Sequence, residues 1–172
     1  MDRLKRNPGA WGLALGAAVA AVAMFLTWIE VTNSAGASEQ YGAIETVTGK
    51  SLFGLAILTI LSGVGVIASH AGGRFAWAFL GLLGGGVLLA ASVWAIADPA
   101  GFTTFAVESE AVTKLTSGSA VQESGETVRA AFADGTLTAS AQLGAVVGLV
   151  GASLATLGAL LSFRRPAAST DS

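Results

Sequence analysis

Side chains suited to catalysis or metal binding are scarce in this 172-residue chain, which has one His and no Cys. A zinc site needs several His or Cys ligands, so His70 alone cannot build one. A Ser-His-Asp triad would require His70 to meet a Ser together with Asp2 or Asp171, and both acids lie at the ends of the chain. Without Cys there is neither a thiol nucleophile nor a disulfide. The sequence therefore predicts a protein that is not an enzyme and needs no metal or cofactor.

Acidic residues gather in two polar stretches, 30–51 and 98–142. They are Glu30, Glu39, Glu45, Asp98, Glu108, Glu110, Glu123, Glu126 and Asp134. The Asp-x-Asp-x-Asp-Gly pattern of a calcium loop is missing, so we expect a solvated acidic surface that attracts cations or a basic partner. An enzyme acting on lipids through Glu30, Asp98 and His70 stays an alternative, because a cluster of acid and base is what that chemistry requires.

Four apolar runs without any charged residue separate these polar stretches. They are 10–29, 52–69, 75–97 and 143–163, with lengths of 20, 18, 23 and 21 residues. A helix needs about 20 apolar residues to cross a bilayer, and backbone groups in lipid must be paired within the segment. Charged residues make up 12% of the chain, against about 25% in soluble domains. The sequence predicts an all-α membrane fold, an antiparallel bundle of four transmembrane helices in a single domain, 1–172.

Basic residues divide unevenly when the N-terminus is placed in the cytoplasm. The inner side then carries Arg3, Lys5, Arg6, Arg74, Arg164 and Arg165, and the outer side carries Lys50, Lys114 and Arg129. Basic residues that flank spans stay on the cytoplasmic side. We therefore expect a multi-pass protein of the plasma (inner) membrane with both termini cytoplasmic. The basic ends would contact anionic lipid and are too few to indicate nucleic-acid binding.

The first run has an alternative interpretation as a cleaved signal peptide. Ala35-Gly36-Ala37 has the small-x-small form of a cleavage site. However, the run is longer than the usual apolar segment of about 7–15 residues, so an uncleaved anchor is expected. Cleavage would leave three spans and an external N-terminus.

Small and aromatic residues within the runs suggest how the helices are placed. Glycines four positions apart allow close helix packing, either inside the bundle or against another subunit. The candidate packing residues are Gly12, Gly16, Gly81, Gly85, Gly144 and Gly148. Trp prefers the membrane–water interface, so Trp11, Trp28, Trp77 and Trp94 are candidate interfacial anchors. No run has an ionisable residue at its centre, which argues against a proton-coupled transporter.

The two outer loops look partly structured and predict a cap on the bundle. In loop 30–51 a short β-hairpin is expected, pairing roughly 29–33 with 41–48, because turn residues separate two alternating segments. An isolated hairpin is marginal in water, so it would rest on the other loop. In loop 98–142 two short helices are expected, one from Thr104 to about 117 and one from Ser124 to Ala133. The C-terminal tail 166–172 is expected to be disordered.

Several features resemble the tryptophan-associated transmembrane proteins of actinobacteria, which have four spans and unknown activity. The matching pieces are Thr27-Trp28-x-x-Val31 at the end of the first run, Thr48-Gly49 before the second, and the glycine-rich third run after Arg74. The similarity covers about the first 100 residues. This resemblance implies the same four-span layout and carries no catalytic residues.

Together these features predict a non-catalytic accessory or scaffold subunit of a membrane complex. Its expected partners are the lipid bilayer and either another membrane protein or further copies of itself. A component of a transporter or channel is the alternative, and it would need a path of Ser and Thr side chains. Residues available for such a path include Thr27, Thr59, Ser62, Ser92, Ser153 and Thr156.

Overall fold

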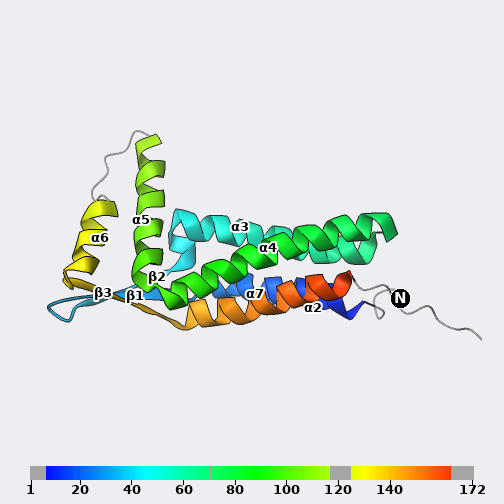
Figure 1. Cartoon of the computed structure of the whole chain (residues 1–172), viewed down its shortest axis with the longest axis horizontal. Coiled ribbons are helices and arrows are strands. Elements are labelled where there is room, and N and C mark those ends of the chain that lie inside the picture. The colour runs from blue at the N-terminus through cyan, green and yellow to red at the C-terminus, as the bar shows by residue number, and fades with distance from the viewer. Residues whose placement is uncertain (1–6, 70, 117–124, 164–172) are drawn as a thin grey trace, which may run out of the picture.

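A bundle of apolar helices forms the long part of the molecule (Figure 1). The structure is a computed structural model and describes residues 7–69, 71–116 and 125–163. The bundle consists of α2 (Pro8–Ala23), α3 (Val47–Ala68), α4 (Ala71–Ala97) and α7 (Leu143–Ser162). By length and composition, three helices within the described residues are able to cross a membrane, namely Val47–Ala68, Gly73–Ala97 and Leu143–Ser162, whereas α2 is a shorter apolar helix of 16 residues.

Polar side chains cap the starts of two of these helices, α2 and α3. Asn7 caps α2 by accepting a hydrogen bond from the Ala10 N–H at 3.3 Å. Pro8 follows it at the first helical position, where its missing N–H costs nothing. The Thr46 hydroxyl accepts from the Gly49 N–H at 2.9 Å and caps α3 in the same way.

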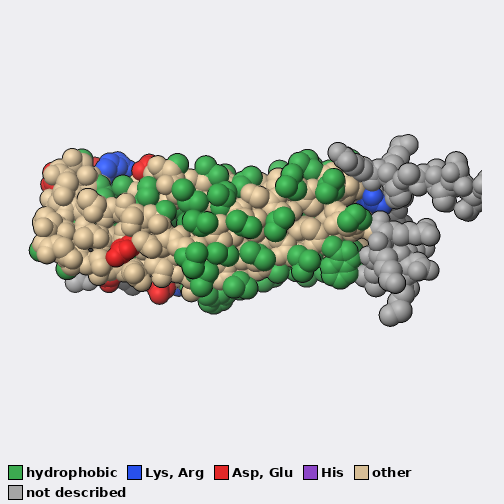
Figure 2. Space-filling view, turned by 90° about the horizontal axis from the view of Figure 1, so that it is seen from below, with side chains coloured by type: hydrophobic (Ala, Val, Ile, Leu, Met, Phe, Trp, Pro, Cys, Tyr) green, Lys and Arg blue, Asp and Glu red, His purple; other side chains and the backbone are tan. Residues whose placement is uncertain are grey.

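Helix α7 has small side chains inside the bundle and large apolar side chains outside, while Leu13, Val66 and Leu88 of the other helices are buried as well. The buried residues of α7 are Gly144, Ala145, Gly148, Gly151, Ala152, Ala155, Gly158, Ala159 and Ser162. Its leucines Leu154, Leu157 and Leu160 are exposed. Figure 2 shows this apolar surface along the bundle, with charged side chains only near its two ends on the face seen. Close packing of small residues surrounded by large apolar ones is the arrangement expected of helices in lipid.

At one end of the bundle, three strands and two helices form what we call the cap, comprising residues 27–45, 99–116 and 125–141. The cap contains β1 (Thr27–Asn33), β2 (Ser38–Gly42), the 3-10 helix η1 (Ala43–Glu45), α5 (Pro99–Thr116), α6 (Gly125–Ala133) and β3 (Leu137–Ala141). The sheet order is β2-β1-β3, and β1 pairs antiparallel with both neighbours. Helix α5 lies across the direction of the bundle helices (Figure 1).

The predicted end of the first span, 10–29, was wrong. Helix α2 ends at Ala23, one further turn runs through Leu26 by i→i−3 bonds, and Thr27 already belongs to β1. Apolarity alone misled the prediction, because Trp28 and Ile29 at the buried start of β1 are as apolar as the helix that precedes them.

The other boundaries differ from the predictions by a few residues. Helices α3 and α4 begin earlier than 52 and 75, and the predicted helices of loop 98–142 are confirmed as α5 and α6. The hairpin is confirmed in part, because β2 ends at Gly42 and residues 43–48 form η1 and the start of α3. The third strand, β3, was not predicted. The predictions for residues 1–6, His70, Glu123 and the tail 166–172 lie outside the described residues.

Candidate binding cavity in the cap

A β-bulge at Trp28 determines how the cap meets the bundle. The register of β1 on β2 changes from Thr27 opposite Gly42 to Ile29 opposite Tyr41, so Trp28 is the extra residue. A bulge bends its strand and redirects a side chain. The Trp28 carbonyl accepts a hydrogen bond from the Gln142 N–H at 2.7 Å, which ties this point to the start of α7.

The Trp28 side chain is enclosed by the bundle. Its Nε1–H donates to the Ala23 carbonyl at 2.7 Å, and the residue is 1% exposed. The indole lies over two glycines of α7: a Cβ at Gly148 would come within 2.9 Å of the ring, and a Cβ at Gly144 would also collide with it. The assignment of Trp28 as an interfacial anchor is therefore corrected, because a buried indole has no surface for lipid headgroups.

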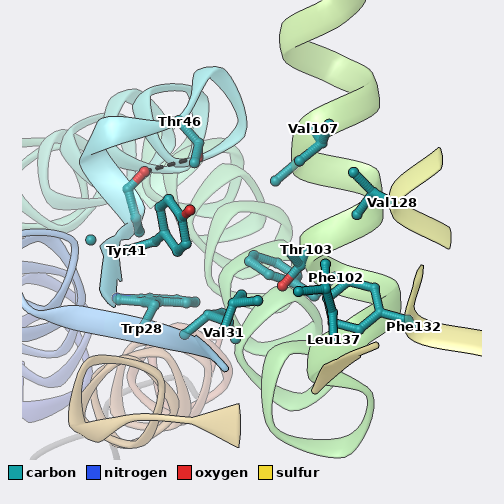
Figure 3. A pocket seen from close by; sticks show the side chains of 14 residues that line it. Trp28, Val31, Tyr41, Thr46, Phe102, Thr103, Val107, Val128, Phe132 and Leu137 are labelled. Carbon is teal, nitrogen blue, oxygen red and sulfur yellow. Dashed lines mark hydrogen bonds between the residues drawn. The ribbon is translucent and has the colours of Figure 1, made fainter. Parts of the chain in front are cut away.

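A cavity of about 170 Å³ lies between this tryptophan, the sheet and helices α5 and α6 (Figure 3). Large apolar side chains from all these elements line it: Trp28, Val31, Phe102, Val107, Val128 and Phe132. None of its lining residues carries a charge. The cavity was not predicted from the sequence, because its walls come from segments far apart in the chain.

The hydroxyl groups at the cavity are engaged within the chain. The Thr46 hydroxyl donates to the Ala43 carbonyl at 2.9 Å, and the Thr103 hydroxyl donates to the Pro99 carbonyl at 2.7 Å. The Tyr41 hydroxyl donates to a Glu39 carboxylate oxygen at 2.7 Å. Each hydroxyl has one hydrogen to donate, so these groups offer no further donor to a ligand.

Aromatic contacts join α5 to the bundle beneath the cavity. The Phe102 ring stacks on Trp28 with centroids 6.1 Å apart and meets Trp94 of α4 edge-on at 5.7 Å. Trp94 also packs against Phe105, with centroids 5.3 Å apart. Such pairs contribute about 0.5–1.5 kcal/mol each beyond their buried area, so α5 is held firmly at its N-terminal half.

One ion pair links the two cap helices. Arg129 of α6 donates to Glu108 of α5 at 2.7 Å, and both side chains are exposed. A Cβ at Gly125 would collide with the Glu108 side chain, so the glycine lets the helices approach. The pair joins α5 and α6 at the surface of the cap. It stabilises the fold only slightly, because exposed ion pairs contribute about 0–1 kcal/mol.

The turn between α6 and β3 lowers the pKa of an exposed carboxyl group, Asp134. Hydrogen bonds from the Thr136 hydroxyl and then from its backbone N–H lower the pKa of Asp134 below 3.8. The N–H bond is 2.9 Å long. Gly135 between them has φ 78°, a conformation that glycine adopts without strain.

The six predicted packing glycines all face other parts of this same chain. On α2, a Cβ at Gly16 would lie 2.7 Å from the Gly151 carbonyl oxygen, and one at Gly12 would lie 3.3 Å from Gly158 Cα. On α4, Gly81 faces the Leu13 side chain and Gly85 faces Thr156. Gly144 and Gly148 face Trp28, as described above. The contacts of Gly12, Gly16, Gly81 and Gly85 are therefore internal to the bundle, and those of Gly144 and Gly148 join the bundle to the cap.

The other three tryptophans lie on the bundle surface. Trp11, Trp77 and Trp94 are 43%, 38% and 39% exposed. Trp77 also packs on α3, since a Cβ at Gly65 would collide with its ring. Their partial exposure is compatible with the predicted anchoring at the membrane interface.

Hydroxyl side chains inside the bundle are bonded to their own helices. Thr59, Ser62, Ser92 and Thr156 each donate to the carbonyl four residues earlier, at 2.8–2.9 Å. In the described part of the chain, no group of three or more His, Cys, Asp or Glu side chains lies close enough to hold a metal ion. The arrangement is that of a closely packed helix bundle with a partly open cavity in its cap.

Comparison with known proteins gives no relative from which a role can be inferred. No protein-family model, curated protein or solved structure matches this chain.

Proposed function

We propose that this protein is a non-catalytic accessory or scaffold subunit of a membrane complex, anchored by four spans and presenting its cap to a partner. The observation that carries the proposal is the contrast between the two parts of the molecule. The bundle packs closely through Gly and Ala together with buried Leu13, Leu88 and Val66, and its buried hydroxyls bond to their own helices, while the cap is built from three chain segments packed on the bundle end. An exposed, structured cap on a closely packed anchor suits recognition better than transport.

The length of α2 is compatible with a fourth span. Sixteen residues extend about 24 Å at 1.5 Å per residue, and the added turn through Leu26 brings the apolar segment close to the roughly 30 Å of a bilayer core. Helix α2 also packs along α7 at Gly12 and Gly16. We therefore assign it to the membrane with the other three helices.

Charge supports an orientation with the cap outside. Arg74 lies at the bundle end opposite the cap, where it donates to the Ser162 carbonyl at 3.1 Å at the end of α7. The cap carries Glu39, Glu45 and Asp134 on its surface. Because basic residues stay cytoplasmic, the Arg74 end and both termini are assigned to the cytoplasm.

A component of a transporter or channel is the second candidate. A conducting path needs exposed polar groups that replace ion hydration. Thr59, Ser62 and Ser92 donate to carbonyls of their own helices and are at most 3% exposed, so they face no open path in this structure. The resemblance to the tryptophan-associated transmembrane proteins stays a prediction, and it would imply the same four-span layout.

The absence of Cys from the chain makes single-Cys variants a direct test of orientation. In intact cells, a membrane-impermeant maleimide should label Ser34→Cys in the β1–β2 turn and leave Gly73→Cys at the opposite bundle end unlabelled until the cells are lysed. Labelling of Gly73→Cys in intact cells would overturn the assigned orientation.

Partner docking is tested by crosslinking in the same cells that are used for the labelling experiment. A photoactivatable maleimide on Ser34→Cys should capture one membrane protein in stoichiometric amount, identified by mass spectrometry after purification in mild detergent. The matched control is Leu157→Cys on the exposed bundle surface, which should capture mainly lipid. A protein that crosslinks to nothing from the cap and conducts ions as a homo-oligomer in liposomes would refute the scaffold proposal in favour of a channel.

A further inference from the structure

We propose that the cavity in the cap is a binding site for a hydrocarbon group, such as part of a lipid acyl chain. The inference is independent of partner docking and rests on the size, the lining and the position of the cavity.

The size of the cavity suits a small apolar group. Its volume is about 170 Å³. An engineered protein cavity of about 150 Å³ lined by apolar side chains stays free of water and binds benzene. The cavity of the present chain is partly open to the outside, so an apolar group that enters it would displace water from aromatic and aliphatic walls.

The lining offers polar and anionic ligands no free hydroxyl or indole donor. Three hydroxyls border the cavity, on Tyr41, Thr46 and Thr103, and each donates its hydrogen within the chain. The indole N–H of Trp28 is likewise bonded to Ala23. A polar ligand would lose its hydrogen bonds to water and find no donor in return, which makes its burial costly. Hydrocarbon is the ligand chemistry that loses nothing on entry.

The position of the cavity puts it within reach of the membrane. Its floor is Trp28, whose ring contacts Gly148 of α7 at the end of the bundle. Across from the floor, Val107 and Val128 come from the two cap helices (Figure 3). The cavity therefore lies at the cap end of the apolar bundle, and two sources of hydrocarbon, the neighbouring bilayer and a free fatty acid, must be separated by experiment.

Photocrosslinking with residue-level mapping tests the proposal on the full-length protein in lipid nanodiscs. One arm uses a phosphatidylcholine with a diazirine in its acyl tail, and the other uses free palmitate with the same group. We expect crosslinks on peptides that contain Val31, Val107 or Val128. Labelling with phosphatidylcholine alone assigns the bilayer as the source, labelling with palmitate alone assigns the free acid, and both results support the site.

Blocking variants distinguish the cavity from general lipid contact. Ala106→Phe fills the cavity from α5, and Val107→Phe is a second blocking variant at a half-buried position. The matched control is Ala130→Phe, which puts the same side chain on the exposed side of α6. The blocking variants should lose the Val31 and Val128 crosslinks, and the control should keep them. Phosphatidylcholine crosslinks around Leu154 on the bundle surface should persist in every variant, which shows that the bundle is folded.

Two results would overturn the proposal. The first is labelling at Leu154 with no labelling at the cavity in either arm. The second is cavity labelling that neither Ala106→Phe nor Val107→Phe reduces. Loss of partner capture from Ser34→Cys would leave this outcome unaffected, so the two proposals fail separately.

Discussion

The close packing of α2 on α7 predicts opposite effects for the same substitution at two glycines. At Gly16, a Cβ would lie 2.7 Å from the Gly151 carbonyl oxygen and 2.8 Å from the Leu154 carbonyl carbon, and it would also collide with the Ala155 nitrogen. All three obstacles are backbone atoms, so no side chain can move aside. At Gly86 in α4, nothing lies within 4 Å of the same Cβ.

The size of the difference follows from two competing effects. Ala in place of Gly stabilises a helix by about 1 kcal/mol. Overpacking costs about 1–3 kcal/mol, and the upper end applies at Gly16 because the blocking atoms are backbone. Gly16→Ala should therefore destabilise the protein by about 2 kcal/mol, and Gly86→Ala should stabilise it by about 1 kcal/mol. The two variants should differ by roughly 3 kcal/mol, about a hundredfold in the unfolding equilibrium.

Unfolding in mixed micelles of a mild detergent and dodecyl sulfate, followed by circular dichroism, measures this difference. Both variants keep the length and charge of the chain, so each serves as the control for the other. Equal stability of Gly16→Ala and Gly86→Ala would refute the inference that α2 and α7 are in backbone contact.

Three further predictions concern the cap. Trp28→Phe removes the indole donor and should cost about 1–2 kcal/mol of unfolding free energy by the same assay. Arg129→Gln breaks the exposed pair with Glu108 and should change the unfolding free energy by less than about 1 kcal/mol, with the effect vanishing at high salt. Thr136→Val should raise the pKa of Asp134 back toward 3.8, measured by carbon-13 NMR of the carboxyl group. Since folding lowers this pKa, the Asp134 contribution to stability is present above pH 3.8 and lost as the pH falls through the folded-state value.

Each of these has an outcome that contradicts it. For Trp28, the control is Trp77→Phe on the bundle surface, where the side chain is 38% exposed, and equal effects of the two changes would show that the Trp28 hydrogen bond does not stabilise the fold. A large loss of stability in Arg129→Gln would mean that the pair with Glu108 holds the cap together. An unchanged Asp134 titration in Thr136→Val would show that the Thr136 hydroxyl does not interact with the carboxylate.

The helices were predictable from the sequence, because the backbone of a long charge-free segment in lipid must form its hydrogen bonds within that segment, as an α-helix does. The start of α2 was also predicted, since Asn7-Pro8 is an ordinary beginning of a helix. The start of α3 was placed at 52 instead of Val47, although Thr46 is a helix-capping residue type. The end of α2 was not, because residues 24–29 are apolar whether they cross a membrane or enter a buried strand.

The candidate site was less predictable than the helices. Strand β3 reads Leu-Thr-Ala-Ser-Ala, which has weak strand character by itself and becomes a strand by pairing with β1. Trp28 was identified as an aromatic at the membrane edge, but its burial depends on a bulge that only the sheet register reveals. The cavity depends on both strand β3 and the bulge at Trp28, so no local sequence pattern predicts it.

The pairing of β1 with β3 also sets an order of events during synthesis. Asn33 pairs with Leu137, so the central strand leaves the ribosome long before its second partner exists. The sheet is completed only when the segment leading into α7 has been made, and Trp28 is covered only when Gly144 and Gly148 of α7 arrive. Until then β1 has an open edge. A nascent chain that lacks the last helix therefore leaves this edge unpaired and the indole uncovered at the same time.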